Sequence, residues 1–180
     1  AALPAAPADL AWLADGRLVV LLAEPSALLI LDGRDGRILT RHDISAALAG
    51  RLAVERDERV AWVAHAAPGM VSRVDLSDGS VHVVATDPGA DGLALRPGHD
   101  ELWVVHRTAN TVAILDTRTQ ALVQRVPCAG FPVRITFSTD GDRALVSCAL
   151  AGEPAGFDAS ARLPEGRVAR GVAHEGDPGW

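Results

Sequence analysis

The sequence contains no lysine and no tyrosine, and all 17 of its basic residues are arginine. These arginines are spread along the chain rather than clustered, and the formal net charge is −6. A nucleic-acid-binding domain carries a concentrated basic patch, so we expect no nucleic-acid partner. No uninterrupted apolar run approaches the roughly 20 residues that a membrane-spanning helix needs, so we also expect no membrane span.

The sequence motifs of common cofactor and metal sites are absent as well. The chain has no Walker loop and no GxGxxG, HExxH, GxSxG, EF-hand or CxxCH pattern, so we predict no cofactor and no metal. There are two cysteines. Cys148 lies in an expected strand, as a small core residue does, but Cys128 could bridge to it if the loop entering the last repeat lies beside that strand. Residues 1–6 lack the positive and long apolar segments of a signal peptide.

What the sequence does contain is a set of short apolar runs, each ended by a polar or Gly/Pro turn. Four of them lie between Asp91 and Pro132, at residues 93–95, 102–105, 112–115 and 122–126. They are rich in valine, leucine and isoleucine, which is typical of strands. The gaps are short enough for hairpin turns, so the segment predicts a four-stranded antiparallel meander.

This unit recurs along the chain with a period of about 42 residues. An aspartate that follows an apolar residue marks each repeat, at Asp32, Asp75, Asp116 and Asp158. Four strands in 40–45 residues are the signature of a β-propeller blade. The sequence therefore predicts an all-β fold, a β-propeller of about four four-stranded antiparallel blades at residues 7–43, 51–86, 90–127 and 131–172.

Two segments depart from the pattern. The run 44–50 is the only short stretch that resembles a helix, and it could bridge the first two blades. In the last repeat, Gly and Pro residues fall where the third strand is due. We therefore expect an irregular stretch over 151–165, followed by a last strand at 167–172.

The segment LWVVHRTANTVAILDTRTQALVQRVPCAGFPVRITFSTDGDRALVSCAL resembles the YVTN family of propeller repeats. Residues Trp103–His106 stand at the YVTN-like tetrad, Thr111–Asp116 at the TVxVID segment and Ser138–Gly141 at the SPDG-like turn. The resemblance is specific over about residues 90–150. It is weaker in the first two repeats, where the tetrads are Val19–Leu22 and Trp62–His65.

The resemblance implies more than the fold. Family members usually have seven blades, and this chain begins and ends within the repeat pattern, so we expect part of a larger, seven-bladed ring; a closed four-bladed ring is the alternative. The family also implies a periplasmic or extracellular, non-catalytic binding or scaffold module, whose loops on one face meet an unidentified small molecule or protein.

The enzymatic alternative rests on similarity as well. YVTN repeats are similar to lactonase-type propellers and to the propeller subunits of amine dehydrogenase and nitrite reductase. On that hypothesis the chain is the propeller part of an enzyme. A third hypothesis is an interaction arm fused to a redox domain.

Two histidines share one register in successive repeats. His65 and His106 are 41 residues apart, and each precedes its repeat's aspartate by ten residues. They either pack at the seam between blades or form a pair that faces a cofactor or metal at the mouth of the propeller. Two histidines without carboxylates at ligand spacing are a weak metal signal.

Four further polar residues are candidates because of where they fall in the repeat. Asp91, Arg107, Asn110 and Arg134 lie in expected loops or at the start of an inner strand, where propeller ligands bind. Arg134 is expected to point toward the central channel. The recurrent aspartates precede tight turns and are expected to hold those turns through hydrogen bonds to backbone N–H groups.

Overall fold

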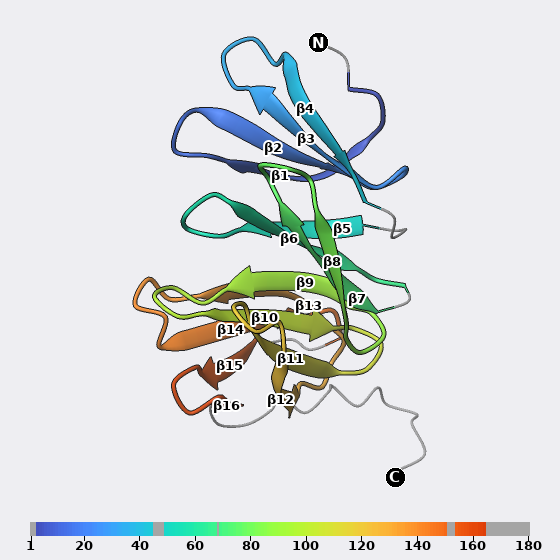
Figure 1. Cartoon of the computed structure of the whole chain (residues 1–180). Helices are drawn as coiled ribbons and strands as arrows, with labels where there is room; N and C mark the ends of the chain where they lie inside the picture. The colour runs from blue at the N-terminus through green and yellow to red at the C-terminus, as the bar shows by residue number, and fades with distance from the viewer. Residues whose placement is uncertain (1–2, 45–48, 68, 151–153, 165–180) are drawn as a thin grey trace.

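Four antiparallel sheets make up the protein in the computed structural model, which describes residues 3–44, 49–67, 69–150 and 154–164 (Figure 1). Each sheet contains four strands that are consecutive in the sequence. Sheet 1 consists of β1 (Pro7–Trp12), β2 (Arg17–Leu22), β3 (Ala27–Asp32) and β4 (Ile38–Asp43). Sheet 2 consists of β5 (Ala49–Val54), β6 (Val60–His65), β7 (Met70–Asp75) and β8 (Val81–Ala85).

The second half of the chain repeats this arrangement. Sheet 3 consists of β9 (Ala90–Leu95), β10 (Glu101–His106), β11 (Thr111–Asp116) and β12 (Leu122–Pro127). Sheet 4 consists of β13 (Pro132–Phe137), β14 (Arg143–Cys148), β15 (Ala155–Asp158) and the short β16 (Leu163–Pro164). No helix occurs in the part of the chain that the structure describes, and within that part nothing helical could cross a membrane. The predicted all-β fold of four-stranded antiparallel blades is confirmed.

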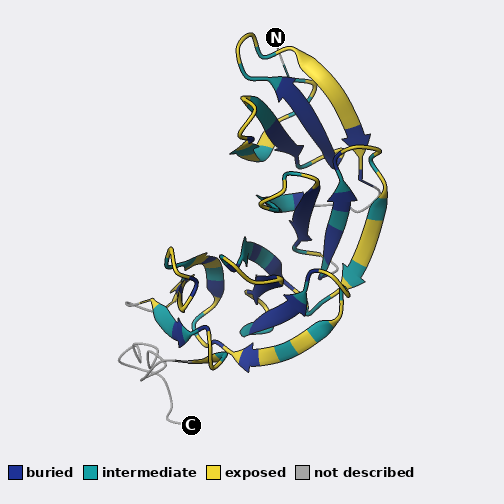
Figure 2. Ribbon diagram, turned by 60° about the vertical axis from the view of Figure 1, so that its left-hand side comes forward, coloured by how far each residue is buried: buried dark blue, intermediate teal, exposed yellow. Residues whose placement is uncertain are grey.

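The sheets stack side by side in an open arc (Figure 2). The first strands of the sheets, β1, β5, β9 and β13, contact one another in succession. The last strands of sheets 1 to 3, β4, β8 and β12, are largely exposed on the convex side (Figure 2). A sheet packed on both faces needs strands that are apolar on both faces. The middle strands meet this condition, since every residue of β6 and of β10 is buried.

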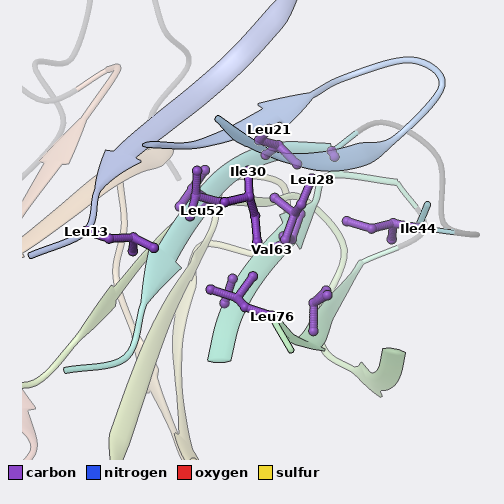
Figure 3. Close-up of a cluster of buried hydrophobic side chains, with 12 residues drawn as sticks. Leu13, Leu21, Leu28, Ile30, Ile44, Leu52, Val63 and Leu76 are labelled. Carbon is purple, nitrogen blue, oxygen red and sulfur yellow. The ribbon is translucent and has the colours of Figure 1, made fainter. Parts of the chain in front are cut away.

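Apolar side chains fill the space between neighbouring sheets. Between sheets 1 and 2, Leu21, Leu28 and Ile30 pack against Leu52 and Val63 (Figure 3). Sheets 2 and 3, and sheets 3 and 4, enclose similar clusters around Trp62 and Trp103. Because each sheet buries its faces only against its neighbours, the stability of this fold comes from stacking.

The outer faces of the first and last sheets are less covered than the inner ones. Trp62 and Trp103 are 0% exposed, whereas Leu145, at the same register of sheet 4, is 51% exposed. At the opposite end, Leu10 is 55% exposed while its counterpart Ile135 is 8% exposed. The described residues thus form an open arc (Figure 2), and the alternative of a closed four-bladed ring is wrong for them.

The recurrent aspartates hold the turns between the third and fourth strands, as predicted. Oδ1 of Asp32, Asp75 and Asp116 accepts a hydrogen bond from the backbone N–H two residues later, at 2.9, 2.8 and 2.9 Å. The pKa of the Asp75 carboxyl group is lowered below its usual value mainly by the hydroxyl group of Ser77, which also donates to Oδ1. The pKa of the Asp116 carboxyl group is lowered mainly by the backbone N–H of Thr119.

Sheet 4 differs from its prediction. Residues Ala155–Asp158, expected to be irregular, form β15 and pair in register with β14, from Val146 with Ala155 to Arg143 with Asp158. The ladder thus overrides the local preference of Gly156. The outermost strand follows at Leu163–Pro164. The strand expected at 167–172 lies outside the described residues, as does most of the helix-like run 44–50, whose last two residues begin β5.

Candidate functional site

Every inner strand carries an irregularity at the same position of the repeat. The register of β1, β5, β9 and β13 against its neighbour shifts once, near the start of the strand. One residue is skipped at each shift: Ala8, Gly50, Asp91 and Val133. A β-bulge re-aims the side chains beside it and is frequent next to binding sites. The residues that follow the bulges are Asp9, Arg51, Gly92 and Arg134.

These four residues border one cavity of about 390 Å³, here called the concave cavity. Most of its lining residues lie on the first strands of the sheets, and the others are Leu145 and Ser147 of β14 and Pro154. The first strands are on the side of the arc away from the exposed last strands (Figure 2). Arg51 and Arg134 belong to β5 and β13, and Gly92 on β9 stands between them in the succession of inner strands. The cavity is therefore lined by two arginines from strands on either side of the strand that carries Gly92, a residue without a side chain.

Gly92 brings the inner strands of sheets 3 and 4 close together. A Cβ atom on this residue would lie 2.4 Å from the carbonyl oxygen of Val133 and 2.9 Å from Cγ2 of Val105. No real Cβ tolerates such distances, so only glycine fits there. The backbone of β13, which carries Arg134, is thus held directly against β9.

The charges in the concave cavity are unequally compensated. Both carboxylate oxygens of Asp9 already accept a hydrogen bond, from the N–H groups of Leu10 and Leu52, both at 3.0 Å. Arg51 makes one long contact, 3.5 Å from Nη1 to the carbonyl oxygen of Ala8. Arg134 is exposed and has no hydrogen-bond or ion-pair partner among the described residues.

The two histidines lie inside their own sheets and not at the concave cavity. His65 and His106 are both 0% exposed, and neither borders the cavity. Nε2 of His65 is 2.9 Å from Oγ of Ser72. Nδ1 of His106 is 3.4 Å from Oγ1 of Thr111, and its Nε2 is buried without a partner among the described atoms.

Burial sets the protonation state of His106. Loss of hydration lowers its pKa to about 4, although the nearby charge of Asp87 acts in the opposite direction. The imidazole is therefore neutral at physiological pH. The burial of both histidines favours the packing hypothesis over the hypothesis of a pair that faces a ligand.

Three other predicted residues stabilise the connections around sheet 3. Nε of Arg107 is 2.6 Å from Oδ2 of Asp91, the bulge residue of β9. The side-chain oxygen Oδ1 of Asn110 accepts a hydrogen bond from the N–H of Phe131 at 2.9 Å. The main-chain carbonyl oxygen of Asn110 accepts one from the N–H of Cys128 at 2.8 Å. Among the six predicted residues, then, Asp91 and Arg107 form an ion pair with one another, and Arg134 is the one that borders the concave cavity.

Sequence reasoning missed Arg51. It lies two repeats before Arg134 at the same position after the bulge, so the repeat itself was the signal that could have found it. Within the described ranges, no group of three or more His, Cys, Asp or Glu residues could hold a metal ion.

Comparison with known proteins gives a result at the level of the fold. No family model matches the sequence, and no curated protein matches it. The structure is similar to hydrazine synthase of Kuenenia stuttgartiensis, with a TM-score of 0.82 and 16% sequence identity over 92% of this chain and 49% of that one. It is also similar to a functionally unknown protein of Desulfotomaculum acetoxidans, with a TM-score of 0.80 and 16% identity over 93% of this chain and 57% of that one.

The chain thus spans about half the length of these two structures. At 16% identity, the similarity concerns the architecture alone. Together with the four stacked antiparallel sheets, it shows that the chain has a propeller-like fold.

Proposed function

We propose that this protein is a non-catalytic binding module of the YVTN propeller type, and that its ligand is an organic anion held in the concave cavity. The observation that carries the proposal is the placement of Arg51 and Arg134 on the wall of one cavity. A planar guanidinium group matches carboxylate and phosphate oxygens with two parallel hydrogen bonds. The lack of an ion-pair partner for Arg134 within the described part of the chain leaves its donors available.

The rest of the cavity wall supports a ligand with an apolar body. Leu52, Leu93 and Ile135, at successive equivalent positions of β5, β9 and β13, also border the cavity. Ligand cavities commonly combine an apolar lining with a few polar groups that fix orientation. Carboxylates and phosphates that carry a hydrocarbon or aromatic group fit this combination.

The exposed leucines at the two ends of the arc support the further proposal of a larger ring. Leu10 and Leu145 occupy positions that neighbouring sheets bury elsewhere in the protein. Blades that cover these faces would extend the arc toward the seven-bladed ring that the YVTN resemblance implies. Loops on one face of that ring would then be available to a protein partner.

The cellular location and the enzymatic alternative also belong to this proposal. We place the module in the periplasm or outside the cell, following the family resemblance, and fractionation of cells that express the full gene would test this. The alternative, that the chain is the propeller part of an enzyme, has a structural neighbour in hydrazine synthase. That likeness supports a shared architecture, while the two arginines support binding.

Calorimetric titration with matched probes tests the binding proposal. Benzoate and phenyl phosphate supply the anion and the apolar body, and benzyl alcohol supplies the body alone. We expect the anions to bind and the alcohol, which lacks the charged group, to bind at least about tenfold more weakly. A tenfold loss of affinity corresponds to about 1.4 kcal/mol of binding free energy. Binding should weaken with added salt.

Variants identify the site. Arg134→Gln and Arg51→Gln should each reduce the affinity for both anions. Arg118→Gln is the matched control, because Arg118 is an exposed arginine that pairs with Asp100 in a turn away from the cavity. Equal affinity in all three variants, or equal binding of benzyl alcohol, would show the proposal to be wrong.

A further inference from the structure

The junction between sheets 3 and 4 brings a cysteine from each side together. Cys128 directly follows β12, and its N–H donates to the carbonyl oxygen of Asn110 at 2.8 Å. The equivalent residues of the earlier junctions, Ile44 and Thr86, make the same backbone bond, to Ser26 and Gly69. The position of Cys128 is therefore set by a repeated backbone contact.

Cys148 approaches the same junction from sheet 4. It is the last residue of β14 and pairs with Pro132 of β13. Beyond it, Ala149 and Leu150 donate backbone hydrogen bonds to the carbonyl oxygens of Phe131 and Gly130, at 2.9 and 3.0 Å. The segment that begins at Cys128 thus runs alongside the end of β14.

The two thiols share one environment. Cys128 is buried and belongs to the apolar cluster between sheets 3 and 4, and the half-buried Cys148 packs against that cluster. Burial raises the pKa of the Cys128 thiol to about 12, and the charge of Cys148 and the side-chain hydrogen bond between the two cysteines act in the same direction. Both cysteines are unbridged in this structure.

We propose that Cys128 and Cys148 are a redox-active pair that forms a reversible intramolecular disulfide by exchange with an external disulfide. The Cys148 thiolate, more accessible than Cys128, attacks one sulfur of the external disulfide and displaces one thiol, which leaves a mixed disulfide. Sγ of Cys128 then attacks Sγ of Cys148, which forms the internal bond and releases the second thiol. The protein loses two protons and two electrons, and the external disulfide gains both.

This order of events follows from the accessibility and acidity of the two thiols. The attacking group must be a thiolate that the oxidant can reach. Cys128 is deeply buried and hard to ionise, so it acts second, as the resolving thiol. The resulting bond would close a loop of about 20 residues that contains the whole of β13, the strand that carries Arg134.

Incubation of the chain in glutathione buffers of defined ratio, followed by acid quenching and alkylation, tests the proposal by intact mass. We expect a species two hydrogens lighter, without alkyl groups. Its ratio to the reduced form should be proportional to the concentration of oxidised glutathione divided by the square of the concentration of reduced glutathione. Trypsin should release residues 126–134 joined to residues 144–162. Two alkylated thiols at every ratio, glutathione held on Cys148 alone, or a disulfide between two chains would overturn it.

A variant at the less buried position keeps the test independent of folding. Cys148→Ser should retain the fold and never yield the lighter species. The oxidised wild type should also melt at a higher temperature than the reduced wild type, because the bond restricts the unfolded chain. This difference should be absent in Cys148→Ser, and a difference of equal size there would overturn the assignment.

Discussion

Nε2 of His65 lies 2.9 Å from Oγ of Ser72, a hydrogen bond between two buried side chains of sheet 2. Sheet 3 repeats the histidine but not the serine. His106 occupies the position of His65, and Ala113 occupies that of Ser72. The Nε2 atom of His106 is left buried without a partner among the described atoms, so the repeat contains its own comparison between a satisfied and an unsatisfied histidine.

Ala113→Ser should stabilise the protein by supplying the missing hydrogen-bond partner. A buried hydrogen bond contributes about 1 kcal/mol, so we expect the free energy of unfolding in urea to rise by about that amount. Ser72→Ala should lower it by about the same amount. In a His106→Leu background, Ala113→Ser should instead destabilise, because the new hydroxyl would then be buried alone. A gain that persists without the histidine would contradict this explanation.

His106 also predicts how stability depends on pH. Its pKa is about 4 in the folded protein, mainly because burial disfavours the charged form, and about 6.5 when unfolded. The unfolded chain therefore binds the proton more readily than the folded one. His106 therefore makes the free energy of unfolding depend on pH. Its contribution, on the order of 3 kcal/mol, is complete above pH 6.5 and is lost as the pH falls toward 4.

Urea unfolding at pH 7 and pH 5 measures this effect before most carboxylates titrate. The wild type should lose stability across this interval, and His106→Leu should lose less. Leucine is the natural control, because Leu22 occupies the equivalent position of sheet 1. Parallel losses in the two proteins would show that the titrating group lies elsewhere.

Most of the fold could be predicted from the sequence, because the repeat shows itself in features that involve residues close together in the chain. The apolar runs and the aspartates before tight turns recur in each sheet, and both depend on local chemistry. The strand β15 was missed for the opposite reason. Gly156 is unfavourable in a strand, yet pairing with Leu145 of β14 holds it there, and that pairing is a tertiary contact.

The candidate site was predicted less completely than the fold. Arg134 was singled out from its place at the start of an inner strand, but the bulge that precedes it leaves no mark in the sequence. The repeat could have shown that Arg51, Gly92 and Arg134 hold equivalent positions, but only the stacking of the sheets shows that they border one cavity. The histidines were conspicuous in the sequence, but their burial depends on how the sheets stack.

Gly92→Ala should destabilise the protein and disturb the concave cavity. The added methyl group would meet the carbonyl oxygen of Val133 at 2.4 Å, so β9 and β13 would have to separate. Overpacking of this kind costs about 1–3 kcal/mol. Gly50→Ala is the matched control, since Gly50 is also on an inner strand, next to Arg51, and a methyl group added there would have no neighbour within 4 Å among the described residues. Equal unfolding midpoints for the two variants would contradict the steric argument.

Glu101 is expected to be the most sensitive charged residue of the described structure. Its carboxylate accepts hydrogen bonds from Nε1 of Trp103 at 2.9 Å, from Nη1 of Arg96 at 3.3 Å and from Nε of Arg162 at 3.1 Å. Burial alone would raise the pKa of Glu101, but these bonds and the charge of Arg162 lower it. The folded protein thus favours the ionised form of Glu101. The resulting contribution of Glu101 to the free energy of unfolding is present at neutral pH and is lost as the pH falls through the pKa that Glu101 has in the folded protein.

Glu101→Ala should therefore cost about 3–5 kcal/mol at pH 7, because among the described residues the buried Arg96 side chain then keeps as counter-ion only Asp142, an exposed carboxylate 4.0 Å away. Asp100→Ala is the control at the neighbouring position. Asp100 pairs with Arg118 at 3.7 Å where both side chains are exposed, and such pairs contribute about 0–1 kcal/mol. Urea unfolding of the two variants should show a large loss for the first and a small one for the second. A small loss for Glu101→Ala would mean that Arg96 finds another partner or reaches water, and that the carboxylate does not hold sheets 3 and 4 together.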